Sequence, residues 1–579
     1  MLQHLVYFLL ISAICCIWGI PLFLLTGLDK KETPWYRSTA GLLAFLFISG
    51  CLTISFLASW LYLFLPLRLP ILLALTLALL LIGLLFCRPR IIVLINQIKN
   101  GFVFLPPAGQ VLVLVSGLLF LALSCLSPNN GDTQIYHLQI IQWENKYRAV
   151  PGIANLFLRT GLGSNWFGLV SLFRLPFFRE ENYSYLNFSL TFWSLVWLLS
   201  SWHFHFRRLT STPGSYILCL FYFLITLYAF YDWYLFRDTA NSTNYDFIVT
   251  ITTLLVISFL LEGIWQPVYQ KDFSPVFLFI SISIIAFKLS GIFILLPVAY
   301  YLFQHRSPGR LLLFGLFSLL IFTPVLLKNY IITGYPLFPL SVSPGSPDWQ
   351  VPKGMVDLLH NYITLSNRFL SQDFTNSYAF RKEHAFWLPY WFRGLGWLHR
   401  VTILLVLSSL ALWKYTAVPT ETRRLRHHIL LLLAMTAGWF FTAPAPRLGY
   451  GILLAAALLP VSIWFGPKIK TSWYIISLWG TAAILCFYIP FKFSVMIRQP
   501  SVWLRPQTVD MPSYSVVKNG NISFHLPDKI YQNDDHRCYN IDLPCICELN
   551  PWLQPRGSFL SDGFRMLPPD SAFIQNYNY

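Results

Sequence analysis

The sequence predicts an all-α polytopic membrane protein with about 14 transmembrane helices. The chain has 579 residues, of which 56% are hydrophobic, 17% aromatic and only 11% charged. A soluble domain of this length does not have such a composition. Continuous apolar runs of roughly 15–25 residues recur along the chain, which is the length that crosses the hydrocarbon core of a bilayer.

The apolar runs place the transmembrane helices in order along the chain. We expect them near residues 3–26, 38–65, 69–87, 111–127, 183–205, 214–231, 246–263, 274–287, 289–304, 311–327, 400–415, 428–443, 448–464 and 472–490. The first run has no basic segment before it and no small-residue cleavage site after it. We therefore expect a retained helix rather than a removed signal peptide.

The spans and the long loops between them divide the chain into five regions. These are extra N-terminal transmembrane helices over 1–110, a transmembrane core over 111–327 with its first outer loop at 128–182, a large outer loop over 328–399, C-terminal transmembrane helices over 400–490 and an outer tail over 491–579. Function is concentrated in loops held by a rigid scaffold, so we expect the active site in one of the long loops.

The net charge of +17 is unevenly distributed, because basic residues collect in alternate short loops. They are Lys30, Lys31, Arg37, Arg88, Arg90, Lys99, Arg207, Arg208, Arg306, Arg310, Arg423, Arg424, Arg426, Lys468 and Lys470. The positive-inside rule places these loops in the cytoplasm, so the long loops and both termini face outward. This pattern argues against nucleic acid as a partner and for membrane lipid.

The cysteines predict one disulfide in the outer tail. Seven of the ten lie in or beside apolar spans, where they serve as small apolar residues. Cys538, Cys545 and Cys547 cluster in the tail, and we prefer the pair Cys538–Cys545, which leaves one thiol over. Zinc is less favoured, since Cys545-Ile-Cys547 lacks the usual spacing of metal-binding thiols.

Asp132 is the most informative single residue. It follows the apolar run Val111–Leu126, where a membrane helix meets water. It has two interpretations that local sequence does not separate. In one, Asp132 is a helix N-cap, for which aspartate is favoured. In the other, it is a general base or an anchor for a cation or an acceptor nucleophile.

The segment after Asp132 predicts a helix over 133–147 on the membrane surface. Tyr136, Ile140 and Trp143 share one face with Tyr147, and such an aromatic face suits the headgroup boundary. His137 lies on the other side, as a headgroup-facing polar residue or as a substrate-binding residue beside Asp132. Ser164–Phe178 is apolar but interrupted by arginine, so we expect an interfacial or re-entrant segment.

Lys288 divides an apolar stretch of about 31 residues, which is long for one span. We therefore expect two short helices joined at Lys288, with the ammonium facing outward. There it either pairs with a phosphate or extends along apolar surface to reach water.

Three further residues lie on the predicted outer face. Arg447 ends the stiff segment Ala443-Pro-Ala-Pro-Arg, where a guanidinium can bind phosphate bidentately or be an ordinary loop residue. Asp246 begins a span. It is either a helix cap or a second acid on the same face as Asp132. Asn329 lies where the chain leaves the membrane before Gly334.

Several signatures of other protein classes are missing from the sequence. It has no P-loop, no dinucleotide-binding glycine pattern and no zinc-protease motif. No cofactor is required by the residues, and a divalent cation has no support. Acids within the spans are few, which argues against an ion-coupled transporter.

Asp132 after a transmembrane helix, the Tyr136-His137…Trp143 stretch and the Phe287-Lys288-Leu-Ser turn resemble the GT-C superfamily of membrane glycosyltransferases. Over nearly its whole length the chain is also similar to a group of uncharacterised bacterial multi-pass membrane proteins. Two features depart from the usual GT-C pattern. The acid follows the fourth predicted span rather than the first, and it is single where many relatives carry two adjacent acids.

The resemblance implies an inverting glycosyltransferase in the bacterial cytoplasmic membrane, with its active site facing the periplasm or exterior. A polyprenyl phosphate or diphosphate would supply the sugar, and a glycan, lipid or protein hydroxyl would accept it. Asp132 would take the acceptor's proton. Lys288 and Arg447 would stabilise the leaving phosphate, while His137 and Asn329 would position substrate.

Two alternatives stay open from the sequence. One is an oligosaccharide ligase, polymerase or oligosaccharyltransferase that uses a lipid diphosphate glycan. The other is a glycolipid flippase or transporter, which would need charged residues along a path through the spans and pseudo-symmetric halves.

Overall fold

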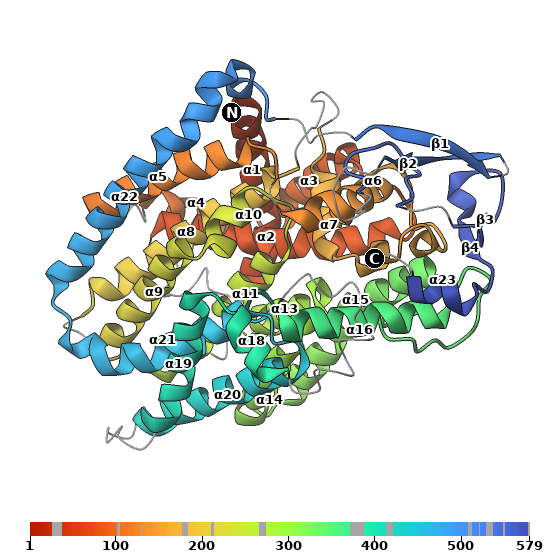
Figure 1. Cartoon of the computed structure of the whole chain (residues 1–579). Helices are drawn as coiled ribbons and strands as arrows, with labels where there is room; N and C mark the ends of the chain where they lie inside the picture. Colours follow the sequence, from red (N-terminus) through yellow and green to blue (C-terminus); the bar gives the residue numbers. More distant parts are fainter. Residues whose placement is uncertain are drawn as a thin grey trace.

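The computed structural model describes most of the chain, and the statements below concern those residues. They are 1–25, 38–100, 105–128, 130–175, 183–209, 213–265, 274–370, 387–412, 421–507, 512–519, 521–528, 537–547 and 550–576. Helices dominate the described residues, and only four short strands lie among them (Figure 1).

Nine helices in the described part are long and apolar enough to cross a membrane. They are α1 (Leu2–Leu25), α2 (Thr39–Tyr62), α3 (Leu69–Phe86), α5 (Pro107–Ser124), α9 (Pro213–Tyr231), α11 (Asp246–Trp265), α15 (Pro308–Thr333), α21 (Tyr450–Phe465) and α22 (Thr471–Arg498). Each coincides with a predicted span. The chain is thus an all-α multi-pass membrane protein.

The five other predicted spans also coincide with helices, but these are shorter or more polar. They are α8 (Tyr185–Phe206), α13 (Ser274–Phe287), α14 (Leu295–Gln304), α19 (Trp397–Leu412) and α20 (Glu421–Thr442). The total of 14 therefore stays a prediction. A further helix, α4 (Arg88–Asn100), lies in a segment predicted as an inward loop.

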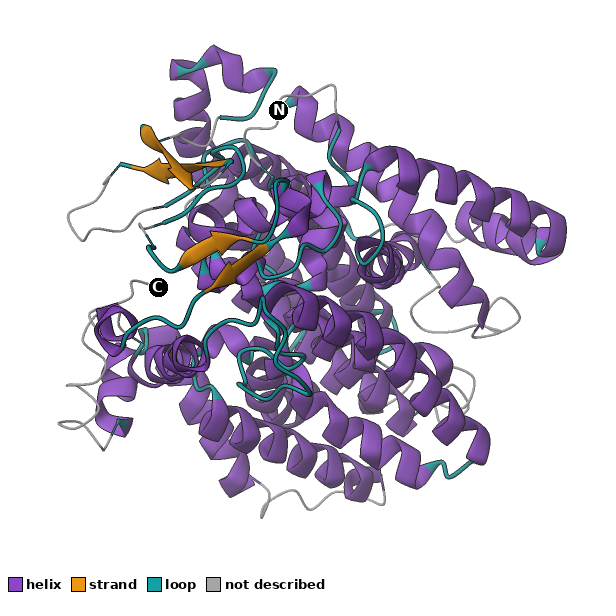
Figure 2. Ribbon diagram, turned by 90° about the vertical axis from the view of Figure 1, so that its right-hand side faces the viewer, coloured by secondary structure: helices purple, strands orange, loops and turns teal. Residues whose placement is uncertain are grey.

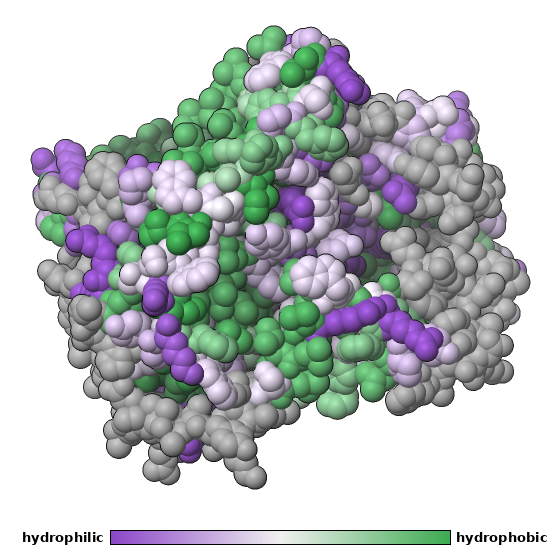
Figure 3. All heavy atoms as spheres, turned by 60° about the vertical axis from the view of Figure 1, so that its left-hand side comes forward, coloured by the Kyte–Doolittle hydropathy of each residue, from purple (hydrophilic) through white to green (hydrophobic). Residues whose placement is uncertain are grey.

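The surface suits a lipid environment. In α3, α15 and α22, less than a third of the most apolar stretch is buried inside the protein, at 17%, 17% and 28%. Their outward side chains are leucine, isoleucine and phenylalanine, as at Leu85, Leu312 and Phe487. Figure 3 shows apolar side chains over wide parts of one face, as expected of helices that meet acyl chains.

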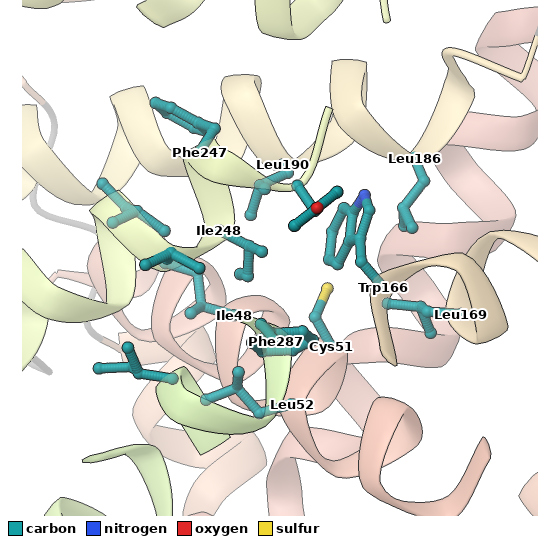
Figure 4. Packing of buried hydrophobic residues seen from close by; sticks show 14 of the residues in the cluster. Ile48, Cys51, Leu52, Trp166, Leu169, Leu186, Leu190, Phe247, Ile248 and Phe287 are labelled. Carbon is teal, nitrogen blue, oxygen red and sulfur yellow. The ribbon is translucent and has the colours of Figure 1, made fainter. Parts of the chain in front are cut away.

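The N-terminal helices are built into the core. A Cβ at Gly50 of α2 would lie 1.7 Å from the carbonyl oxygen of Cys15 in α1, so only glycine permits this approach of the two backbones. Gly19 of α1 meets Leu46 in the same way. Figure 4 shows Ile48 and Cys51 of α2 packed near buried side chains of other elements. The extra helices over 1–110 are therefore part of one bundle.

The first outer loop forms a compact layer of short helices. It contains the π-helix η3 (Thr133–His137), α6 (Leu138–Lys146), the 3-10 helices η4 (Ile153–Asn155) and η5 (Leu158–Leu162), and α7 (Asn165–Leu172). The helix over 133–147 is confirmed, but its place at the membrane surface is wrong. Tyr136, Ile140 and Trp143 are buried inside the protein. The reason is that α7 packs against α6 on one side and the C-terminal tail covers it on another.

In its described part, residues 164–175, the apolar segment forms the eight-residue helix α7, which is too short to span a bilayer. All eight residues are buried, and Trp166 donates a 2.8 Å hydrogen bond from Nε1 to Oδ1 of Asn187 in α8. Figure 4 places Trp166 and Leu169 beside residues of α2, α8, α11 and α13. The helix α7 is therefore enclosed by other elements of the protein.

Lys288 interrupts the helix where the sequence predicted. The helix α13 ends at Phe287, Lys288 is extended with φ −158° and ψ 128°, and the 3-10 helix η7 (Leu289–Ile294) leads into α14. Two short segments therefore replace one long span.

The large outer loop begins where α15 ends at Thr333 and Gly334 takes a left-handed conformation with φ 85°. It contains α16 (Lys353–Phe369) and α18 (Leu388–Gly394), while residues 371–386 lie outside the described residues. Asp348 of this loop forms a paired ion contact with Arg556 of the tail, at 2.8 and 3.0 Å. The loop and the tail are therefore joined.

The C-terminal tail contains two small antiparallel sheets that the sequence did not predict (Figure 2). Their strands are β1 (Tyr514–Asn519) with β2 (Ile522–Pro527), and β3 (Leu553–Pro555) with β4 (Phe564–Met566), and the chain closes with α23 (Ser571–Asn576). The disulfide Cys538–Cys545 is confirmed, and Sγ of the remaining Cys547 lies 3.8 Å from Sγ of Cys538.

The disulfide loop is fastened to the first outer loop. Gln139 of α6 donates hydrogen bonds from Nε2 to the carbonyl oxygens of Tyr539 and Ile541, at 3.1 and 2.9 Å. Lys146 at the end of α6 pairs with Asp542 at 3.0 Å. The tail thus holds α6 against the bundle, next to the segment that carries Asp132.

Candidate active site

Charged side chains from distant parts of the chain converge at one end of the bundle. Asp132 follows α5, Asp246 begins α11, Lys288 separates α13 from η7, and Arg447 lies in the 3-10 helix η8 (Pro446–Leu448) between α20 and α21. This is the end that the charge pattern predicts to face outward. Four of the predicted site residues therefore meet there.

Asp132 and Arg447 form the first ion pair. Nη1 of Arg447 donates to Oδ2 of Asp132 at 3.2 Å. The side chains are 28% and 47% exposed, so both can be reached from outside. Asp132 itself has helical backbone angles, and its side chain makes no capping hydrogen bond. The capping interpretation of Asp132 is therefore wrong, and its carboxylate is available to Arg447.

Asp246 and Lys288 form the second ion pair through Oδ1 and Nζ. The Lys288 ammonium also lies 4.7 Å from the centre of the Tyr245 ring, a distance at which a cation is attracted to the ring face. Oδ1 of Asn244 accepts the backbone N–H of Asp246 at 2.8 Å. Because Asn244 performs the capping, the carboxylate of Asp246 is free to face Lys288.

The positive charges around Asp132 determine its ionisation. Burial alone would raise its pKa, but the charges of Arg447, Arg159 and Lys288, together with that of His137 once it is protonated at low pH, outweigh burial and lower the pKa to about 2. The carboxylates in turn raise the pKa of Arg447 above its ordinary value, against the opposing effect of burial. Asp132 is therefore an anion, and a weak base, for as long as Arg447 is its partner.

His137 lies directly behind this pair and does not face lipid headgroups. It is 1% exposed, and Nδ1 lies 2.9 Å from the hydroxyl of Thr243. Burial lowers its pKa to about 4, although Asp132 and Asp246 act in the opposite direction. The imidazole is neutral at pH 7, and its buried Nε2 has no hydrogen-bond partner among the described residues.

Asn329 is in a different place from these residues. It donates from Nδ2 to the carbonyl oxygen of Pro336 at 3.1 Å, and so closes the turn after α15. Its neighbour Lys328 is buried and donates to Oδ1 of Asn165 in α7 at 3.3 Å. These contacts hold the large outer loop to the bundle, which is a structural role.

Three further residues of the site, Arg159, Asp238 and Tyr450, were not predicted from the sequence. Arg159, in η5, adds a third positive charge that acts on Asp132, and its guanidinium lies over the ring of Tyr362 at 5.5 Å. No motif surrounds Arg159, so no sequence signal could have identified it. Asp238 had a signal, because Asp232, Asp238 and Asp246 recur within one short segment of a chain that has few acids.

Asp238 differs from the other acids in its partners. It is buried, and Nδ2 of Asn130 donates to Oδ2 at 3.2 Å. Burial raises its pKa, the amides of Asn130 and Asn244 partly offset that effect, and the charge of Asp246 raises it further. Asp132 and Asp246 are both paired with cations, whereas the hydrogen bond described for Asp238 comes from an amide.

A small cavity lies beside the two ion pairs. Its volume is about 30 Å³, enough for one or two water-sized groups. It is lined by Asn130, Tyr234, Leu235, Asp238, Asn244, Asp246, Phe247, Thr250, Arg447 and Tyr450. Tyr450 is fixed from behind, since its hydroxyl lies 3.0 Å from Oδ2 of Asp232 and 2.9 Å from Nε2 of His399.

A second, narrower cavity of about 10 Å³ adjoins the first, with Thr250 and Tyr450 shared between them. Its walls come from α11, η7, α20, η8 and α21, and include Ile294, Met435 and Ile452. The two cavities are therefore neighbours, and the same two side chains contribute to both.

Comparison with known families places the chain in one of them. The model of the domain of unknown function DUF8201 matches residues 1–454. The chain belongs to the DUF8201 family. No curated protein and no solved structure matches it.

The DUF8201 match contains the whole charged site, from Asp132 to Arg447 and Tyr450, and ends within α21. The disulfide and both sheets of the tail lie beyond it. In the described residues, no group of three or more histidine, cysteine, aspartate or glutamate side chains could hold a metal ion. The arrangement instead offers fixed cations and carboxylates, which suit the binding of an anion and the transfer of a proton.

Proposed function

We propose that this DUF8201 protein is a GT-C-type glycosyltransferase with 14 transmembrane helices. It transfers a sugar from a polyprenyl phosphate or diphosphate to an acceptor hydroxyl on the outer face of the bacterial cytoplasmic membrane. One observation carries the proposal. An accessible Asp132–Arg447 pair stands near Lys288 and Arg159 at one end of the helix bundle, beside a small cavity with carboxylate, amide and guanidinium groups in its lining.

The reaction is a single displacement. The acceptor oxygen attacks the anomeric carbon as the bond from that carbon to the phosphate oxygen breaks, and Asp132 takes the acceptor's proton. The lipid phosphate leaves with the bonding electron pair. Arg447, Lys288 and Arg159 stabilise its charge, and the anomeric configuration is inverted. No nucleotide is needed, because the sugar is already attached to a good leaving group.

The Asp132–Arg447 pair couples donor binding to the formation of the base. With Arg447 as its partner, Asp132 has a pKa of about 2 and accepts protons poorly. A donor phosphate that binds Arg447 bidentately competes with the carboxylate for the same guanidinium. When Arg447 turns to the phosphate, the pKa of Asp132 rises towards its ordinary range. The base is then stronger only when the donor is present.

The other residues have supporting roles. Lys288 holds Asp246 and presents its ammonium to the phosphate, and neutral His137 fixes Thr243 and the ring of Tyr245 behind the site. The lipid tail lies in a groove between helices of the bundle. Asn329 acts through the fold of its turn and does not touch substrate.

Arg159 favours a second candidate within the same class. A third cation suits a diphosphate better than a monophosphate, and lipid diphosphates carry whole oligosaccharides. The chain would then be an oligosaccharide ligase or polymerase. Parallel reactions with mono- and diphosphate donors separate the two, because Arg159→Ala should impair the diphosphate reaction much more than the monophosphate reaction if this candidate is right.

The direct test is an incubation of purified protein in lipid nanodiscs with polyprenyl-phosphate-linked sugars, with release of the lipid phosphate as the readout. We expect release that Asp132→Asn abolishes. The matched control is Asp542→Asn. It removes the same charge from the Lys146–Asp542 ion pair, which joins α6 to the tail and lies outside the site. Release that survives Asp132→Asn undiminished contradicts the role of the base.

A further inference from the structure

The cavity beside Arg447 has a charge opposite to that of the phosphate site. Two carboxylates line it, those of Asp238 and Asp246, together with the amides of Asn130 and Asn244. Its one cation, Arg447, already faces Asp132. Arg447 therefore marks a boundary, with phosphate-binding cations on one side and a lining of hydrogen-bond acceptors on the other.

The hydrogen bonds of the lining leave acceptor capacity unused. An ionised carboxylate has about four acceptor sites. Asn130 donates to Oδ2 of Asp238, and Lys288 donates to Oδ1 of Asp246, so each acid keeps lone pairs for a further donor. The hydroxyl of Tyr450 is oriented by Asp232 and His399. A ligand that brings hydroxyl or amino groups would satisfy these acceptors.

We infer that this cavity is the sugar subsite of the proposed transferase, and that it takes donor sugars with hydroxyl or amino groups and rejects acidic ones. The inference rests on the proposed function, because Arg447 would then join the phosphate site to the sugar subsite. A carboxylate placed between Asp238 and Asp246 brings no proton to these acceptors and is repelled by each of them that is ionised, which is unfavourable in a buried setting.

The size of the cavity limits which part of the sugar can enter it. About 30 Å³ holds one or two water-sized groups and not a whole ring. The subsite therefore receives an edge of the sugar, such as an exocyclic hydroxymethyl group, while the ring lies at the mouth near Asp132 and Arg447. Oxidation of that hydroxymethyl group to a carboxylate is the change to which the subsite is most sensitive.

The test uses matched pairs of donors that differ only at this group. They are polyprenyl-phosphate-linked glucose with glucuronic acid, and galactose with galacturonic acid. Whichever donor pair the protein accepts as substrate, we expect kcat/KM to be about 100-fold higher for the neutral sugar than for its acidic partner. For Asp238→Asn, which removes one charge and keeps the shape, we expect this ratio to fall at least about tenfold.

Asp542→Asn is the control, since it makes the same substitution at an exposed acid of the tail and should leave the ratio unchanged. Unfolding temperatures of both variants show whether each is folded. If no donor reacts with the wild-type protein, the proposed function itself fails. If donors react but the acidic partner is used equally well, or Asp238→Asn leaves the ratio unchanged, the sugar subsite is wrong while the transferase stands.

Discussion

Both ends of α11 carry a buried acid, and the two acids have different surroundings. Asp246 begins the helix and Glu262 lies near its other end, and each side chain is 9% exposed. Asp246 faces the ammonium of Lys288 and lines a cavity. Glu262 accepts a 2.8 Å hydrogen bond from the hydroxyl of Tyr222, and Nε2 of His205 is 3.6 Å away.

The comparison shows that burial of an acid does not by itself identify an active site. The cations near Asp246 remain accessible, since the side chains of Lys288 and Arg447 are 21% and 47% exposed, whereas that of His205 is 6% exposed. An incoming anion can therefore take over the partners at one end of α11. At the other end, the acid is enclosed by aromatic groups, which fits a role in holding α8, α9 and α11 together.

The largest expected effect is at Asp132. Asp132→Asn keeps the shape and the hydrogen-bond acceptor but removes the proton acceptor, so kcat should fall by about 10²–10⁴-fold with little change in unfolding temperature. The assay is release of lipid phosphate under single-turnover conditions. A variant that retains wild-type kcat would place the base elsewhere.

Substitution of Arg447 should cause the second-largest loss of reaction rate. Arg447→Ala removes a cation that contacts the leaving group, and the rate should fall by about 10²–10³-fold. Arg447→Lys keeps the charge but cannot form the bidentate contact, so it should recover only part of the rate. Lys146→Ala is the control, because Lys146 forms an ion pair of similar length at the surface of α6. Equal rates for both Arg447 variants and wild type would contradict phosphate binding.

The buried imidazole of His137 predicts a dependence of stability on pH. Its pKa falls from an ordinary 6.5 to about 4 on folding, so the unfolded chain binds more protons between these values. The stabilisation is complete above pH 6.5 and is lost as the pH falls towards 4, by about 3 kcal/mol in all. Unfolding temperatures at pH 7 and pH 5 should therefore differ more for wild type than for His137→Gln. Identical pH slopes would show that the imidazole is not held neutral.

The smallest effect is expected at Glu262. Glu262→Gln keeps an acceptor for Tyr222, so the free energy of unfolding should fall by only about 1 kcal/mol, and turnover per folded molecule should not change. Thermal unfolding and the phosphate-release assay measure the two quantities. A large loss of turnover at unchanged stability would make the two ends of α11 functionally equivalent and favour a path through the bundle.

Much of the fold could be predicted because lipid imposes a simple rule on the chain. Apolar length alone placed a helix at each predicted span, and the stretch around Lys288 was too long for one span and is indeed interrupted there. The surface placement of the helix over 133–147 failed for a physical reason. An aromatic face such as that of Tyr136 and Trp143 suits either headgroups or a protein interior, and only the tertiary contact with the tail decides between them.

The site could be predicted residue by residue but not as a set of contacts. Asp132, Asp246, Lys288 and Arg447 were recognisable because each lies beside an apolar run on the predicted outer face, in a chain that is only 11% charged. Which cation pairs with which acid depends on how α11, η7 and η8 pack, and no local pattern contains that information. Asn329 is a residue for which position alone was misleading. It lies at the predicted membrane boundary, which suggested contact with substrate, but its side chain closes a turn.

Phosphate release from a polyprenyl-phosphate-linked sugar, compared between wild type, Asp132→Asn and Glu262→Gln, tests the central claim most directly. We expect release and transfer by the wild-type protein and by Glu262→Gln, and none above background by Asp132→Asn. Equal release by all three proteins, or release abolished only by Glu262→Gln, would contradict an active site built on the Asp132–Arg447 pair.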